Sequence, residues 1–224
     1  MMIFDRDNFY RIAPFAAYVF FMLVEDALLA FGWDANDVRL LYVIKITVVA
    51  SLLWLWRNAY SELRWPAGEN WRTWLIAIAA GIVVFVAWIN LTADWMVMGE
   101  SIGFDPRDGD AQMDWFLVIV RLLGAALVVP LMEELFWRSF LMRWIAHPHF
   151  LSVNPAQVGF KAFCITAVLF AVAHSLWFAG LLAGIAYNLL YMRSNTLWSP
   201  IIAHAVTNAI LGVWIVLTGN WGFW

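Results

Sequence analysis

Long apolar runs separated by short polar loops dominate the chain, and they predict a bundle of membrane helices. A helix needs about 20 apolar residues to cross the hydrocarbon core of a bilayer. By this measure the sequence predicts seven spans, at residues 12–31, 39–56, 73–90, 115–145, 160–177, 179–192 and 197–217. The fourth run is too long for one straight crossing, so it either tilts or continues outside the membrane. We expect an all-α, polytopic helix bundle that forms one domain over residues 1–224.

The fifth and sixth runs are joined by a very short stretch, SLWFAG, and should form a tight hairpin. Gly180 and Gly184 are four residues apart, and small residues at this spacing let two membrane helices approach closely. We therefore expect the glycines to face the other helix of the hairpin.

The composition supports a membrane protein. The chain is 64% hydrophobic and 13% charged, with a mean hydropathy of +0.77, whereas soluble domains are about half apolar and a quarter charged. The first run is long and contains Glu25 and Asp26, so we expect it to remain as a membrane helix and not to be a cleaved signal peptide. Nothing in the composition suggests a nucleic-acid partner.

Basic residues are concentrated in alternate loops, which predicts the orientation. The loops at 57–72 and 143–161 are basic, whereas the loop at 91–114 has a single arginine, Arg107. The acidic residues of that loop are Asp94, Glu100, Asp105, Asp108, Asp110 and Asp114. Because cytoplasmic loops are enriched in lysine and arginine, we expect a cytoplasmic N-terminus and an external 91–114 loop.

One group of charges lies within the outer half of the predicted spans. Glu25 and Asp26 in the first run are at a depth similar to that of Lys45 in the second and Arg121 in the fourth. Opposite charges inside a membrane protein usually pair with one another. We expect a salt bridge between one of the two acids and Lys45 or Arg121, holding the three helices together.

A second group of polar residues lies at a shared depth on the cytoplasmic side of mid-membrane. It comprises Glu133, Glu134 and Arg138 in the fourth run, His174 in the fifth, and His204 with Asn208 in the last. Ionisable residues are costly inside a bilayer and are therefore candidates for function.

Helical geometry assigns different directions to the two glutamates. Adjacent residues point about 100° apart on an α-helix, and Glu134 lies four residues before Arg138, the spacing at which opposite charges meet. Glu133 is then free to face His174. His204 and Asn208 are also four residues apart, so they present neighbouring hydrogen-bond donors.

These groups favour hydrolysis of an acyl bond by an activated water molecule. A carboxylate beside an imidazole can act as a general base, and histidine and asparagine donors can stabilise an oxyanion. The chain has no serine in a G-x-S-x-G turn, and Cys164 lies ten residues before His174, on a different part of the helix. We expect no covalent intermediate, and a cavity between the fourth, fifth and seventh runs that opens to the cytoplasmic half of the membrane.

The motifs EELFWR, FAVAH and HAVTN occur in this order on separate predicted helices. Together they resemble the EExxxR, FxxxH and HxxxN motifs of the intramembrane glutamic endopeptidases, the family of CAAX prenyl-protein proteases and bacteriocin-processing or immunity proteins. The resemblance covers residues 130–210, whereas residues 1–115 carry no recognised motif. It implies a metal-independent peptidase without a cofactor. Its site residues would be Glu133 and His174 to activate water, His204 and Asn208 to form the oxyanion site, and Glu134, Arg138 and Phe170 in support.

The same resemblance implies a membrane-associated protein or peptide substrate, cut near its C-terminus within the lipid bilayer. The phrases EELFWRSFLMRW and IIAHAVTNAILGVW are similar to the bacterial branch found beside exosortase and PEP-CTERM sorting systems. That branch implies exosortase-system proteins as partners and a multi-pass location in the inner (cytoplasmic) membrane.

Three other functions remain open from the residues alone. Glu133, His174 and His204 are ligand types that could hold zinc in a membrane hydrolase, although the sequence lacks H-E-x-x-H. A non-catalytic immunity or scaffold protein could retain the fold and bind a partner in the cleft. A small proton-coupled transporter is disfavoured because the chain has no internal repeat.

Overall fold

The structure, a computed structural model, describes residues 5–66, 68–99, 103–107 and 112–224. All regular structure in these ranges is helical, and the described part of the chain contains only one isolated β-bridge, between Arg107 and Met113. The all-α fold class is confirmed. Glu100, Asp108 and Asp110 of the acidic loop lie outside the described residues.

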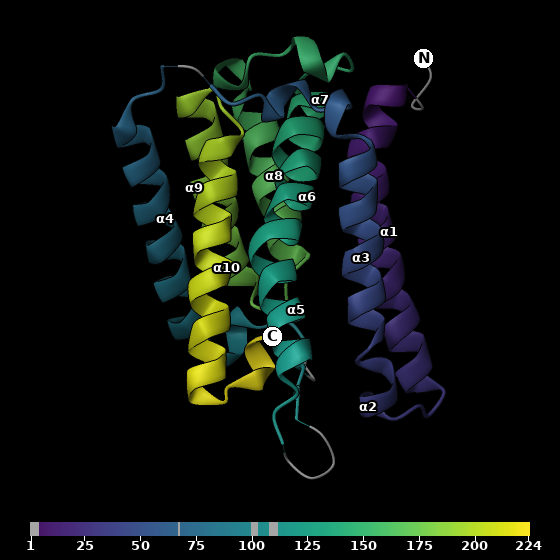
Figure 1. The fold of residues 1–224 in the computed structure, drawn as a ribbon. Coiled ribbons are helices and arrows are strands. Elements are labelled where there is room, and N and C mark those ends of the chain that lie inside the picture. Colours follow the sequence, from purple (N-terminus) through teal and green to yellow (C-terminus); the bar gives the residue numbers. More distant parts are fainter. Residues whose placement is uncertain (1–4, 67, 100–102, 108–111) are drawn as a thin grey trace.

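A helix lies at each of the seven expected ranges (Figure 1). These helices are α1 (Arg6–Ala30), α3 (Leu41–Leu55), α4 (Trp71–Asn90), the composite helix Trp115–Ala146, α8 (Phe160–Val172), α9 (Trp177–Ser194) and α10 (Trp198–Thr218). The connections contain α2 (Ala35–Val38) and short 3-10 turns: η1 (Arg57–Ala59), η2 (Ser61–Leu63), η3 (Asp94–Met96), η6 (Phe150–Ser152), η7 (Pro155–Gln157) and η8 (Trp221–Phe223).

Within the described residues, α1, α4, Trp115–Ala146 and α10 are long and apolar enough to cross a membrane, and α3 and α8 are shorter apolar helices. A multi-helix membrane protein is therefore supported. The number of crossings and the cytoplasmic N-terminus remain predictions. In Figure 1, α4 lies at one side of the bundle and α1 with α3 at the other, with the composite helix and α10 between them.

The composite helix contains two π-helical segments. It consists of α5 (Trp115–Leu123), the π-helical η4 (Gly124–Val128), α6 (Val129–Glu134), the π-helical η5 (Leu135–Met142) and α7 (Arg143–Ala146). Pro130 lacks an amide hydrogen and its ring crowds the preceding turn, which disfavours regular α-helix around it. The adjacent glutamates thus lie on a short α-helical segment between two wider π-helical ones, a feature that often occurs at functional sites.

The α8–α9 hairpin is tight, as expected. A Cβ atom added to Gly184 would lie 3.0 Å from the carbonyl oxygen of Ala167, and one added to Gly180 would lie 3.3 Å from that of Ala171. Both glycines therefore allow close contact between the two helices.

The expected end of the fifth helix was wrong, because α8 ends at Val172 and not at 177. His174 consequently lies in the turn between α8 and α9 and not within a helix. The segment around η3 holds this turn in place, since the Met98 amide donates to the Ser175 carbonyl at 2.7 Å and Trp177 Nε1 donates to the Trp95 carbonyl at 2.9 Å.

The expected salt bridge in the outer charge cluster is present between Lys45 Nζ and Glu25 Oε2, at 3.5 Å. It links α1 to α3, and the Lys45 ammonium also lies over the rings of Tyr18 and Tyr42. Arg121, the other possible partner in that prediction, forms no ion pair within the described part of the chain and lies over aromatic rings instead.

A polar network that the sequence did not suggest joins the other end of the bundle. Glu62 accepts hydrogen bonds from Arg11 at 2.7 Å and from Ser139, and it lies 3.6 Å from Arg143. Burial raises the pKa of Glu62, but the hydrogen bonds and charge of Arg11, with the Ser139 hydrogen bond, outweigh burial and leave this pKa below its usual range. The network fixes α1 and the α3–α4 connection against η5.

Candidate active site

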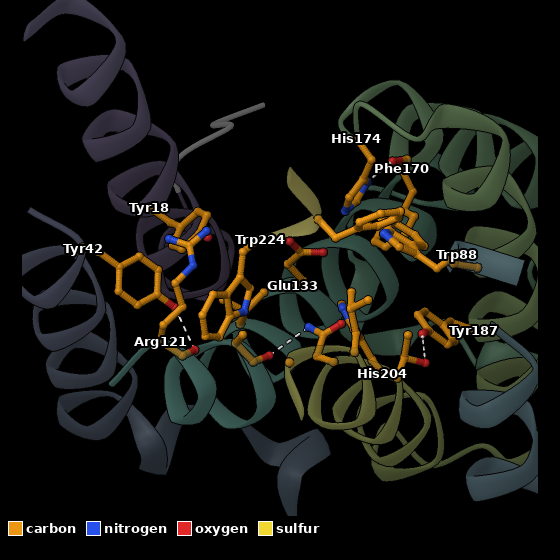
Figure 2. A pocket seen from close by; sticks show the side chains of 18 residues that line it. Tyr18, Tyr42, Trp88, Arg121, Glu133, Phe170, His174, Tyr187, His204 and Trp224 are labelled. Carbon is orange, nitrogen blue, oxygen red and sulfur yellow. Dashed lines mark hydrogen bonds between the residues drawn. The ribbon is translucent and has the colours of Figure 1, made fainter. Parts of the chain in front are cut away.

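A cavity of about 210 Å³ brings five of the expected site residues together (Figure 2). Glu133 lines it from α6, Phe170 from α8, His174 from the α8–α9 turn, and His204 and Asn208 from α10. The other two expected residues, Glu134 and Arg138, lie outside this lining and are fully buried.

Glu134 connects α6 to α10. Its Oε1 atom lies 3.0 Å from Arg138 Nη1, which is the expected pair at i,i+4, and 2.9 Å from His204 Nδ1. The contact with His204 was not expected from the sequence, which assigned His204 only to the oxyanion site. Glu134 therefore positions His204 as well as neutralising Arg138.

Arg138 is held on several sides. Its Nε donates to Asn188 Oδ1 at 3.2 Å, and its guanidinium carbon lies 4.2 Å from the centre of the Phe170 ring. Asn188 Nδ2 in turn donates to the Phe163 carbonyl at 3.1 Å. Sequence reasoning missed Asn188, although a carboxamide inside an apolar run was a usable signal.

The His204 ring is fixed by stacking as well as by Glu134. The Tyr187 ring lies nearly parallel to it, with 5.1 Å between ring centres. The Tyr187 hydroxyl lies 2.9 Å from Thr207 Oγ1, which also lies 2.8 Å from the Gly81 carbonyl on α4. Because Nδ1 of His204 bonds to Glu134, only Nε2 of this ring remains available to a ligand.

His174 has a defined tautomer. Its Nδ1 lies 2.7 Å from the Phe170 carbonyl oxygen, and a carbonyl oxygen only accepts, so Nδ1 carries the hydrogen. In the neutral ring, Nε2 then has the lone pair. Trp88 packs edge-on against this ring, with 5.4 Å between ring centres. His174 therefore offers a hydrogen-bond acceptor.

Glu133 is buried but not paired. Its residue is 8% exposed, and its Oε2 atom has no hydrogen-bond partner in the described part of the protein. Figure 2 shows Glu133 and His174 directed into the same cavity from opposite walls. Buried carboxylate oxygens without partners are rare and costly. This carboxylate is therefore available to a water molecule or a ligand.

The side-chain amide of Asn208 already makes one hydrogen bond within the protein. Its Nδ2 donates to the Ala125 carbonyl in η4 at 2.8 Å, so one of its two amide hydrogens remains for the cavity.

The cavity differs from the expected one in its extent. Besides the fourth, fifth and seventh expected helices, its lining includes Tyr18 of α1, Tyr42 of α3, Arg121 of α5 and Trp224. Among its lining residues none lies between Glu133 and Phe170 in the sequence, so the cavity does not reach the 147–159 loop. It runs toward the end of the bundle where α5 begins, and its opening to the cytoplasmic half of the membrane remains a prediction.

Among the described residues, no three His, Cys, Asp or Glu side chains gather closely enough to hold a metal ion. Glu133, His174 and His204 do not form the zinc ligand set that their residue types allowed.

Comparison with known proteins agrees with the motifs. Neither the curated proteins nor the solved structures include a match to this chain. The model of one family, described as Type II CAAX prenyl endopeptidase Rce1-like, matches residues 115–210. This segment contains the EELFWR, FAVAH and HAVTN motifs and every expected site residue. Residues 115–210 are therefore similar to the Rce1-like family of type II CAAX prenyl endopeptidases.

Proposed function

We propose that this chain is an intramembrane endopeptidase that hydrolyses a peptide bond near the C-terminus of a membrane-associated protein. The family match supports a protease, and the apolar helices support a multi-pass membrane location. The observation that carries the proposal is the buried, unpartnered Glu133 carboxylate in one cavity with His174, His204 and Asn208.

Glu133 and His174 are suited to hold and activate one water molecule. The Glu133 carboxylate and the Nε2 lone pair of His174 are both acceptors, and a water molecule has two hydrogens to donate. Glu133 takes one proton as the water oxygen attacks the carbonyl carbon of the substrate, which is general-base catalysis.

His204 and Asn208 are suited to stabilise the resulting oxyanion. His204 Nε2 donates to the oxyanion only if the ring carries both protons, because Nδ1–H is directed to Glu134. The Glu134 carboxylate stabilises this imidazolium by its charge. When the intermediate collapses, the C–N bond breaks and the proton on Glu133 passes to the departing amine, so no covalent enzyme intermediate forms.

The finer assignments are part of the proposal. We propose metal-independent, glutamic-type chemistry, location in the inner membrane and membership of the branch beside exosortase systems. We also propose that the substrate of this chain need not carry a prenyl group, so that the CAAX name describes ancestry.

The proposal is tested by comparing membrane and secreted proteomes of wild-type cells with those of a Glu133→Gln strain. The amide keeps the size of the carboxylate but cannot take the proton, so at least one protein should retain an uncleaved C-terminal segment. Glu69→Gln is the matched control, because Glu69 lies outside the cavity and bonds only to Thr73 among the described contacts. Identical cleavage in the Glu133→Gln strain would refute the enzyme and favour an immunity or scaffold protein. Loss of activity on exhaustive chelation, restored by zinc, would favour the zinc hydrolase.

A further inference from the structure

Arg121 lies in the same cavity as Glu133 but toward the other end, and its guanidinium has no acceptor among the described residues. Arg11, Arg138 and Arg143 are each buried and donate to carboxylate, amide, hydroxyl or carbonyl oxygens. Arg121 donates no hydrogen bond and forms no ion pair with any residue that the structure describes. A cation within an apolar helix is costly unless it is paired, so an anion is the expected ligand.

The surroundings hold the guanidinium in place without occupying its N–H groups. Its central carbon lies 4.4 Å from the centre of the Phe104 ring, 4.6 Å from that of Tyr42 and 5.8 Å from that of Trp224. Aromatic rings pack on the face of a guanidinium, whereas its five N–H groups lie in its plane. The in-plane donors therefore remain available.

Two neighbours complete this end of the cavity, Tyr42 by fixing the backbone and Trp224 by offering a donor. The Tyr42 hydroxyl donates to the Arg121 carbonyl at 3.3 Å, which fixes the backbone beneath the side chain. Trp224 Nε1 is buried and has no partner among the described residues, so it is a second donor at the cavity wall. The nearby Lys45 is already paired with Glu25. The uncompensated positive charge thus belongs to Arg121.

We infer that Arg121 binds the free carboxylate at the C-terminus of the substrate, an inference that rests on the proposed peptidase function. Arg121 and Glu133 are twelve positions apart on one helix, or roughly 18 Å at about 1.5 Å per residue. An extended peptide covers about 3.3 Å per residue. A carboxylate held by Arg121 therefore places the bond to be cut about four to six residues before the C-terminus.

The test compares two forms of one probe. Randomised dodecapeptides with an N-terminal palmitoyl group are made once with a free C-terminal carboxylate and once as the isotope-labelled carboxamide. Equimolar mixtures are added to Glu133→Gln protein in phosphatidylcholine liposomes, and mass spectrometry gives the bound ratio of the two forms. Because hydrogen bonds to charged groups are strong, the free acid should bind about 10- to 100-fold more tightly.

Substitution of Arg121 identifies the group responsible. In the Glu133→Gln background, Arg121→Gln should bring the bound ratio close to one, and Arg121→Lys should keep part of the preference because it keeps the charge. Arg72→Gln, an exposed arginine at the start of α4, is the matched control and should leave the ratio unchanged. Equal binding of acid and amide by the parent protein overturns the inference without any further variant.

A phosphate of an acidic lipid could supply the same anion, and the assay separates the two sources. If lipid phosphate occupied the site, acid and amide would bind equally, and adding phosphatidylglycerol would stabilise the parent but not Arg121→Gln. That result would overturn the inference. If the acid bound preferentially but the wild-type protein did not cleave it, the peptidase function would be refuted. The carboxylate site at Arg121 would still be supported.

Discussion

Removal of the Glu134 carboxylate should destabilise this protein far more than removal of an exposed carboxylate with the same helical spacing. Glu134 and Arg138 are both completely buried. In Glu134→Ala the guanidinium keeps Asn188 as an acceptor but loses its only ion-pair partner in the described structure. His204 Nδ1 loses its partner as well.

The size of the effect follows from this burial. Breaking a buried ion pair by removing one partner costs about 3–5 kcal/mol. Glu134→Gln keeps an oxygen that can accept a hydrogen bond from Arg138 or His204. It should therefore lower the free energy of unfolding by less, roughly the 1.5–3 kcal/mol that a hydrogen bond to a charged group contributes. A Glu134→Met, Arg138→Met double variant removes both charges and should recover part of the loss, since apolar replacement of a buried pair is often tolerated.

The free energy of unfolding can be measured in detergent micelles by titration with a denaturing detergent. Asp7→Asn is the matched control: Asp7 is also four residues from an arginine, Arg11, at 3.6 Å, but its side chain is 44% exposed. Asp7→Asn should lower the free energy of unfolding by less than about 1 kcal/mol. Turnover per folded molecule is measured in parallel, and Glu134→Gln should lose turnover even where it remains folded, because His204 loses its negatively charged partner.

Two results would refute this reasoning. One is a Glu134→Ala variant that unfolds within about 1 kcal/mol of the wild type, the range expected of an exposed pair. The other is a double variant that is less stable than Glu134→Ala, which would mean that an unpaired Arg138 is not the source of the loss.

Two further predictions concern Asn208 on α10 and Glu62 in η2. Asn208→Ala should lower turnover about a hundredfold with little change in KM, because it removes an oxyanion donor; Asn208→Asp should not restore the rate, and a rate near that of the wild type would exclude the role. The folded-state pKa of Glu62 lies below its unfolded value, so its stabilisation is present above about pH 4.3 and is lost as the pH falls through the folded-state pKa. Unfolding curves should show this acid loss in the wild type and not in Glu62→Gln, and parallel curves would contradict it.

Local spacing was enough to predict several parts of the fold and the site. The apolar runs gave the long helices, because burial in hydrocarbon requires a minimum apolar length. The Glu134–Arg138 pair followed from four-residue spacing on one helix, and the contacts of Gly184 from the small-residue pattern. These features depend on residues that are neighbours in one helix or in one hairpin.

Features that depend on distant residues could not be predicted in this way. Glu134 meets His204 across 70 positions, and the Arg11–Glu62 pair spans 51, so only the packing of the bundle brings them together. The position of His174 depends on α8 ending at Val172, which the η3 segment stabilises from outside the hairpin. The sequence is apolar through the end of α8, so it did not indicate that a turn follows Val172.

The two adjacent glutamates show why a long apolar helix carries three ionisable residues within six positions, at 133–138. Arg138 and His204 both bond to Glu134 Oε1, and the roughly 100° between adjacent residues directs Glu133 to the cavity instead. If Arg138 paired with Glu133, the guanidinium would occupy the carboxylate that we propose as the proton acceptor for water. Glu134 thus neutralises the arginine within the protein, and Glu133 remains unpaired beside His174. A single glutamate at this position could not do both, because one carboxylate cannot be held by a buried cation and also remain free to take a proton from water.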